Sequence, residues 1–131
     1  SAKDNAVFYV KNADGTETAY HGMKVKGDAM KKISNAASLG FNNAYFYKLV
    51  YTENGNSVFV DPVDNEVFVI KLKDQKVGQM IDKRKNEILS KELAEYLSGC
   101  KELSAEIKAG AFDLKNQENL INIIKEFNSC K

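Results

Sequence analysis

Two cysteines, Cys100 and Cys130, enclose the C-terminal part of the chain, and their placement constrains the fold more than any other feature. One helical pattern follows Cys100 and stops at Gly110, and another runs from Asn116 to Phe127, just before Cys130. About ten residues of helix climb ~15 Å and about twelve descend ~18 Å. An antiparallel helical hairpin would therefore bring the two residues near the ~5.5 Å Cα separation of a disulfide. We predict that Cys100 and Cys130 are bonded to each other.

This bond would have consequences for stability and for location. Closing a loop of ~30 residues contributes about 3–4 kcal/mol in the chain-entropy model. Disulfides persist outside the reducing cytosol, so we expect a periplasmic or secreted protein. The alternative is a pair of buried thiols in a cytosolic protein, because free cysteine is a good small core residue. The absence of a C-x-x-C pair argues against a zinc knuckle or a thioredoxin-type motif.

The chain starts Ser1-Ala2-Lys3 and lacks the apolar core of a signal peptide. This start is compatible with a tag remnant. It is equally compatible with a protein trimmed just after a signal peptide or a lipoprotein anchor.

The composition indicates an ordinary globular domain. The chain has 131 residues, of which 44% are hydrophobic and 28% charged, enough for one domain with its own core. Lysine and arginine number 19 and aspartate and glutamate 18, a net charge of +1. This balance argues against a nucleic-acid-binding module. No apolar run is long enough to span a membrane.

Strand-like patterns dominate the first half of the chain. They occupy residues 6–11, 17–26, 43–52, 57–60 and 66–72. Asp14-Gly15 and Asn54-Gly55 are typical of hairpin turns. Between the second and third patterns, Asp28 is a plausible N-cap for a helix that stops at Gly40.

Helical periodicity dominates from Asp74 onward. Residues from Val77 to Leu97 predict one long helix or two in line, and two further helices follow Gly99. Strands first and helices after predict an α+β fold with an antiparallel sheet of about five strands and one inserted helix, in the order ββαβββ. We expect a single domain over 1–131, strand-rich at 5–72 and helical at 75–129.

The C-terminal segment resembles a tail of uncharacterised secreted Bacteroidetes proteins. The resemblance rests on Tyr96-Leu97-Ser98-Gly99-Cys100, on Leu103, Ile107 and Phe112, and on the helix that ends Phe127-Asn128. The chain departs from the tail at Lys101, where proline is frequent, and at Phe127, where tyrosine is frequent. The resemblance covers under a third of the chain. It implies an exported location and carries no catalytic residues.

Catalytic and metal-binding motifs are scarce. His21 is the only histidine, so a Ser-His-Asp or Cys-His arrangement would have to use it. None of the usual phosphate-binding, dinucleotide-binding, esterase or zinc-protease motifs occurs. The group Asp61, Asp64, Asn65 and Glu66 offers oxygens to Ca²⁺, but its spacing is not that of an EF-hand, and Pro62 favours a plain turn. We predict neither a cofactor nor a metal.

The third strand pattern is rich in tyrosine. Tyr45, Tyr47 and Tyr51 follow a period of two with Leu49, which predicts one shared face. Exposed tyrosines would form an aromatic platform for a protein or ligand, with Tyr9 or Tyr20 alongside. In the competing interpretation, the rings pack under a helix with their hydroxyls at the rim.

Three function hypotheses follow. The first is a non-enzymatic exported module that binds a protein or ligand through its aromatic sheet face. The second is a small hydrolase with a carboxylate or His21 site. The third is a structural subunit that buries its apolar sheet face in a homodimer.

Overall fold

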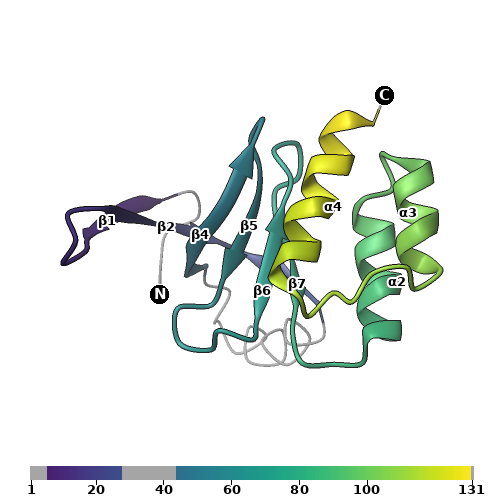
Figure 1. Cartoon of the computed structure of the whole chain (residues 1–131), viewed down its shortest axis with the longest axis horizontal. Helices are drawn as coiled ribbons and strands as arrows, with labels where there is room; N and C mark the ends of the chain where they lie inside the picture. Colours follow the sequence, from purple (N-terminus) through teal and green to yellow (C-terminus); the bar gives the residue numbers. More distant parts are fainter. Residues whose placement is uncertain (1–5, 28–43, 131) are drawn as a thin grey trace.

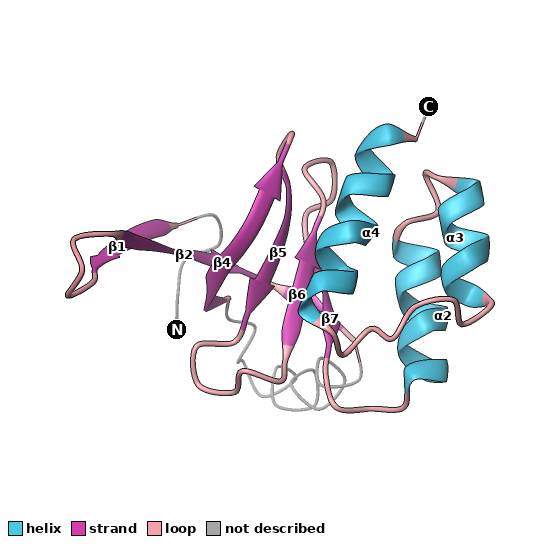
Figure 2. Ribbon diagram, in the orientation of Figure 1, coloured by secondary structure: helices cyan, strands magenta, loops and turns pink. Residues whose placement is uncertain are grey.

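A curved sheet with helices gathered on one side forms the described part of the chain, residues 6–27 and 44–130 of a computed structural model (Figures 1 and 2). The strands are β1 (Val7–Lys11), β2 (Glu17–Met23), β3 (Val25–Lys26), β4 (Tyr45–Glu53), β5 (Asn56–Val60), β6 (Phe68–Lys71) and β7 (Gly78–Ile81). The helices are α2 (Asn86–Tyr96), α3 (Lys101–Lys108) and α4 (Gln117–Ser129). The fold is α+β, as the sequence predicts.

Two short turns shape the hairpins of the sheet. Between β1 and β2, the Asp14 carboxylate accepts hydrogen bonds from the Thr16 backbone N–H (3.0 Å) and hydroxyl (2.6 Å), as aspartate commonly does in turns. Between β4 and β5, Asn54 and Gly55 have positive φ values of 54° and 82°, which a two-residue type I′ turn requires. Both turns lie where the Asp-Gly and Asn-Gly pairs predict them.

The strand order makes the sheet curve back on itself. The order is β1-β2-β4-β5-β6-β7-β3, antiparallel throughout except for the parallel pair of β3 and β7. Only Lys24 separates β2 from β3 along the chain, yet β2 pairs with β4 and β3 pairs with β7. The continuous segment from β2 to β3 therefore joins both ends of the β4–β7 meander, much as in a small barrel.

Two hydrophobic clusters cover the two faces of this curved sheet. The inner cluster contains Met23, Val25, Tyr47, Phe59, Val69 and Met80. The outer cluster joins the opposite face of β5 and β6 to the helices and includes Val58, Ile70, Leu89, Leu93, Ile107, Leu120, Ile123 and Ile124. Consecutive residues such as Val69 and Ile70, both 0% exposed, point into different clusters. This explains why β6 is apolar on both faces.

The predicted disulfide is confirmed. Cys100 directly precedes α3, Cys130 directly follows α4, and their Cα atoms are 5.8 Å apart. Asn116 begins α4 by accepting a hydrogen bond from the N–H of Asn119 at 3.2 Å, as expected of an N-cap. The bond therefore closes the helical hairpin that the sequence predicts.

Three parts of the fold prediction are wrong: the number of strands, the antiparallel sheet and the start of the helical region. The described sheet has seven strands rather than about five, and the β3–β7 pair makes it mixed rather than antiparallel. The helical region begins at Asn86, because the segment Gly78–Ile81 forms the buried strand β7. A Cβ atom at Gly78 would lie 2.5 Å from Cγ1 of Val69. The apolar pattern of this short segment is compatible with either a strand or a helix. In the structure it packs closely against β6 as a strand.

The inserted helix predicted from Asp28 to Gly40 lies outside the described residues. Three C-terminal helices are present as predicted. Among the described residues, no helix combines the length and the apolar content needed to cross a membrane.

Candidate interaction surface

The β1–β2 hairpin extends away from the body of the sheet, and β1 forms its outer edge (Figure 1). Every residue of β1 is exposed. The exposed fractions of its apolar side chains are 45% for Val7, 39% for Phe8, 64% for Tyr9 and 42% for Val10. Neighbouring apolar side chains exposed on both faces of one strand commonly mark an interaction site. Within the described part of the chain, β1 is therefore the clearest candidate surface.

No described strand pairs with the outer edge of β1, so alternate backbone groups of β1 point away from the described sheet. The Gly22 N–H donates to the Ala6 carbonyl and the Asn12 N–H donates to the Thr16 carbonyl, each at 2.7 Å. Bonded and non-bonded pairs alternate along an antiparallel ladder. The backbone groups of Phe8 and Val10 therefore point toward β2. Those of the odd-numbered residues Val7, Tyr9 and Lys11 point outward.

An aromatic cluster stiffens one face of the hairpin. The Phe8 ring stacks on the Tyr20 ring, with centroids 5.0 Å apart and planes within 7°. The same ring makes a T-shaped contact with the Phe46 ring, with centroids 4.6 Å apart and planes at 83°. These rings come from β1, β2 and β4, so the cluster ties the projecting strand to the body of the sheet. Val7 and Tyr9 lie on the opposite face of β1.

The structure does not bring the three predicted tyrosines to one face. Leu49 pairs with Phe59, but Tyr51 pairs with Val58, so an extra residue bulges from β4 between Leu49 and Tyr51. A bulge of this kind reverses the alternation of side chains beyond it. Tyr47 is 3% exposed in the inner cluster, whereas Tyr51 packs against the outer cluster.

Of the three predicted tyrosines, Tyr45 is the most open, with 42% of its surface exposed. Tyr51 is half-buried on the helix side, where its hydroxyl donates to the Glu53 carboxylate at 2.6 Å. Lys125 of α4 places its amine 5.7 Å from the centre of the Tyr51 ring. A continuous platform of Tyr45, Tyr47 and Tyr51 is therefore absent, while Tyr45 keeps an accessible ring.

His21 lies on the inner face beside aromatic rings. Its ring centre is 5.0 Å from that of Phe59, and its backbone pairs with Tyr47. Burial lowers the pKa of His21 below its ordinary value. Burial also raises the pKa of Tyr47 to about 12, with smaller contributions from Asp61 and Tyr45. These environments favour the neutral forms of both side chains at neutral pH.

The acidic loop after β5 folds as a hydrogen-bonded turn. The Asp61 carboxylate accepts from the N–H groups of Val63 (2.8 Å) and Asp64 (3.0 Å). The Lys83 amine lies 2.8 Å from the Asp64 carboxylate and 3.5 Å from that of Glu66. The hydrogen bond from Lys83 is the main cause that lowers the pKa of Asp64. The carboxylate oxygens of this loop therefore accept hydrogen bonds within the turn and pair with Lys83. Among the described residues, no group of three or more side chains could hold a metal ion.

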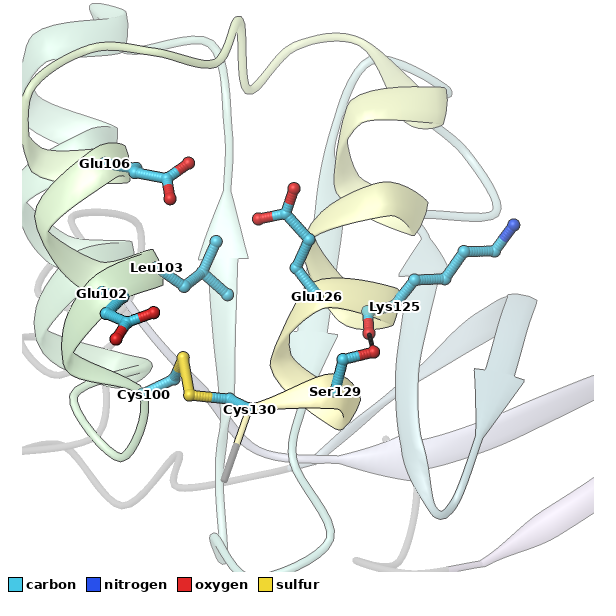
Figure 3. Close-up of a pocket in the computed structure, with 8 residues that line it drawn as sticks. All are labelled: Cys100, Glu102, Leu103, Glu106, Lys125, Glu126, Ser129 and Cys130. Atoms are coloured by element: carbon cyan, nitrogen blue, oxygen red, sulfur yellow. Dashed lines mark hydrogen bonds between the residues drawn. A yellow bond between two sulfur atoms is a disulfide. The ribbon is translucent and has the colours of Figure 1, made fainter.

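A groove of about 350 Å³ lies beside the disulfide, between α3 and α4 (Figure 3). Glu102 and Glu106 line it from α3 and Glu126 from α4, whereas the Lys125 amine points away. Ser129 donates its hydroxyl to the Lys125 carbonyl at 3.1 Å. The groove is therefore a negatively charged hollow between two helices. None of the residues that line it belongs to β1, so it is separate from the exposed strand.

The exposed edge of β1 was not anticipated from the sequence. The strand at 6–11 is predicted, but an apolar run without alternation is typical of a central strand with both faces covered. The position of this run in the sequence was the signal that could have indicated an edge strand. The run is the first strand of the first hairpin, so only one strand adjacent in sequence is available to pair with it.

Comparison with models of known protein families, with curated proteins and with solved structures found no match to this chain. We therefore infer function from the geometry of the site.

Proposed function

We propose that this chain is an exported, non-enzymatic interaction module that binds a protein through the free edge of β1. The observation that carries this proposal is the exposure of β1, in which Tyr9 is 64% and Val7 45% exposed, along a hairpin that projects from the sheet (Figure 1). Natural proteins usually protect an edge strand with charged residues, proline or a covering element. In β1 the sole charge is Lys11, at the end of the strand.

The geometry suits the addition of a partner strand. A partner laid along β1 would pair with the outward N–H and C=O groups of Val7, Tyr9 and Lys11, and this main-chain pairing supplies affinity. Alternate side chains of β1 would contact it on both faces, which supplies specificity. Burying four large apolar side chains adds the favourable term common to protein association.

The hairpin is held in the conformation that a partner strand needs. The Asn12 amide donates to the hydroxyls of Thr16 (3.0 Å) and Thr18 (2.9 Å), which closes the turn. The stacked ring of Phe8 fixes the other end of the strand against Tyr20. A strand ordered before binding loses less conformational entropy on association.

The exported location is supported by the bond between Cys100 and Cys130, because structural disulfides are rare in reducing compartments. Of the tyrosines predicted to bind, Tyr45 is available to extend the contact onto β4, since 42% of its surface is exposed.

Site-specific photocrosslinking in the cells that produce the protein tests this proposal. A photoreactive phenylalanine replaces Tyr9 in one variant and Ile88 in a matched control. Ile88 is a similarly open apolar residue of α2, 45% exposed. We expect protein adducts from position 9 and few from position 88. No adduct from position 9, or equal adducts from both positions, would contradict the proposed surface.

A further inference from the structure

Resting on the proposed function, we propose that the partner strand is β1 of a second copy of this chain. The two strands pair antiparallel about a two-fold axis that passes beside Tyr9. The backbone of β1, its side chains and its charge support this partner and this register in turn.

The backbone selects the register. The outward groups belong to Val7, Tyr9 and Lys11, because the bonds at Ala6 and Asn12 fix the alternation. Pairing Tyr9 with the Tyr9 of the second copy places Val7 opposite Lys11 in both directions. Every outward N–H and C=O group of β1 then has a hydrogen-bond partner within β1 of the second copy. Centring the pairing on Phe8 leaves Lys11 outside the matched strands, and centring it on Val10 leaves Val7 outside.

The side chains fit this register on both faces. On one face, Phe8 lies opposite Val10 of the second copy, so each aromatic cluster of Phe8, Tyr20 and Phe46 gains an apolar neighbour. On the other face, Tyr9 lies opposite its own copy, and the aliphatic part of Lys11 covers Val7. Aromatic and β-branched cross-strand pairs are among the favourable ones in sheets.

Charge does not oppose the pairing. Lys11 is the only charged residue of β1, and the register places the two Lys11 residues four positions apart along the strands. Four residues of strand span about 13 Å, beyond the screening length of about 8 Å at physiological ionic strength. The two amines therefore repel each other little.

The symmetry also explains how such an edge avoids open-ended assembly. A two-fold pairing uses the same strand in both copies and closes on itself. The last strand in the described order is β3, which has only two residues. Its edge therefore has few backbone groups with which a further copy could pair. Because each copy contributes one short strand, the interface is small, and we expect a reversible, concentration-dependent dimer.

Charge complementation at Tyr9 tests the partner and the register together. In sedimentation velocity, the wild-type protein should shift from monomer toward dimer as its concentration rises. Tyr9→Lys and Tyr9→Glu should each stay monomeric, because each places like charges directly across the two-fold axis. An equimolar mixture of the two variants should recover a dimer that weakens with added salt. Ile88→Lys, which changes α2, should dimerise as the wild type does.

Three results would overturn this inference. They are a wild-type protein that is monomeric at every concentration, a dimer that survives Tyr9→Lys, and a mixture that stays monomeric although both variants keep the wild-type circular dichroism. The proposed function fails separately. Photocrosslinks from position 9 to a different protein would support β1 as the interaction surface and contradict pairing with a second copy. An adduct of twice the monomer mass would support both the interaction surface and the pairing with a second copy.

Discussion

The hydroxyl of Tyr96 accepts a hydrogen bond from the backbone N–H of Leu72 at 3.0 Å, which ties α2 to the segment that leaves β6. The same hydroxyl donates to the carbonyl of Val77 at 2.8 Å, just before β7. Tyr96 is 2% exposed. One phenol oxygen thus holds together both ends of the β6–β7 connection.

Replacing Tyr96 with phenylalanine should lower the free energy of unfolding by about 1–3 kcal/mol, because a buried N–H and a carbonyl lose their partner. Urea denaturation measures this change. Tyr45→Phe is the matched control, since Tyr45 is 42% exposed, and it should change stability by less than about 0.5 kcal/mol. Equal effects of the two variants would contradict this expectation, because the buried hydroxyl of Tyr96 would then contribute no more to stability than the exposed hydroxyl of Tyr45.

Removing the disulfide should destabilise the protein substantially. The double variant Cys100→Ala/Cys130→Ala opens a loop with a sequence separation of 30 residues, and we expect a loss of about 3–4 kcal/mol in the chain-entropy model. Thermal denaturation with and without a reducing agent measures it. Reductant should lower the melting temperature of the wild type only. A wild type insensitive to reductant under conditions that demonstrably reduce the bond would contradict this expectation.

Glycine at position 78 permits the close approach of β7 to β6. In Gly78→Ala the new Cβ would meet Cγ1 of Val69 at 2.5 Å, and overpacking of this kind costs about 1–3 kcal/mol. Chemical denaturation should show this loss, and adding Val69→Ala should change stability non-additively. In Gly99→Ala the nearest atom would be 3.7 Å away, in Phe127, so this control should remain close to the wild type.

Alkaline pH should destabilise the fold through two buried tyrosines. Burial raises the pKa of Tyr47 and of Tyr96 to about 12, against an ordinary value of 10.0. Between these values the unfolded chain releases protons that the folded chain keeps, so stability falls as pH rises. The phenolate absorbance should show that Tyr47 and Tyr96 ionise later than the exposed tyrosines. Tyr47→Phe should remove one of them and flatten the decline, and a decline of unchanged slope would contradict the assignment.

Local chemistry in the sequence predicted much of the fold. Asp14-Gly15 and Asn54-Gly55 mark turns whose conformations depend on those residue types. Asn116 caps a helix through its own side chain, and the helix lengths bring Cys100 to Cys130. Each of these features depends on residues near one another in the sequence or on simple helix geometry.

The features that sequence analysis missed depend on distant contacts. Strand β7 pairs with β6 and β3, and Gly78 permits its close approach to Val69, although its apolar residues also suit a helix. The parallel pairing of β3 with β7 joins segments far apart in the chain. The bulge in β4 arises from its pairing with β5 and moves Tyr51 away from Tyr47. A tyrosine spacing of two cannot reveal such a bulge.

Amide hydrogen exchange along β1, followed by nuclear magnetic resonance, tests the central claim most directly. In dilute monomer, the amides of Phe8 and Val10 should be protected by β2, whereas those of Val7, Tyr9 and Lys11 should exchange rapidly. Raising the protein concentration should slow exchange at the three odd-numbered residues while the even-numbered ones change little. Protection of Tyr9 in the dilute monomer, or odd-numbered amides that stay fast at a concentration where the dimer predominates, would contradict the account.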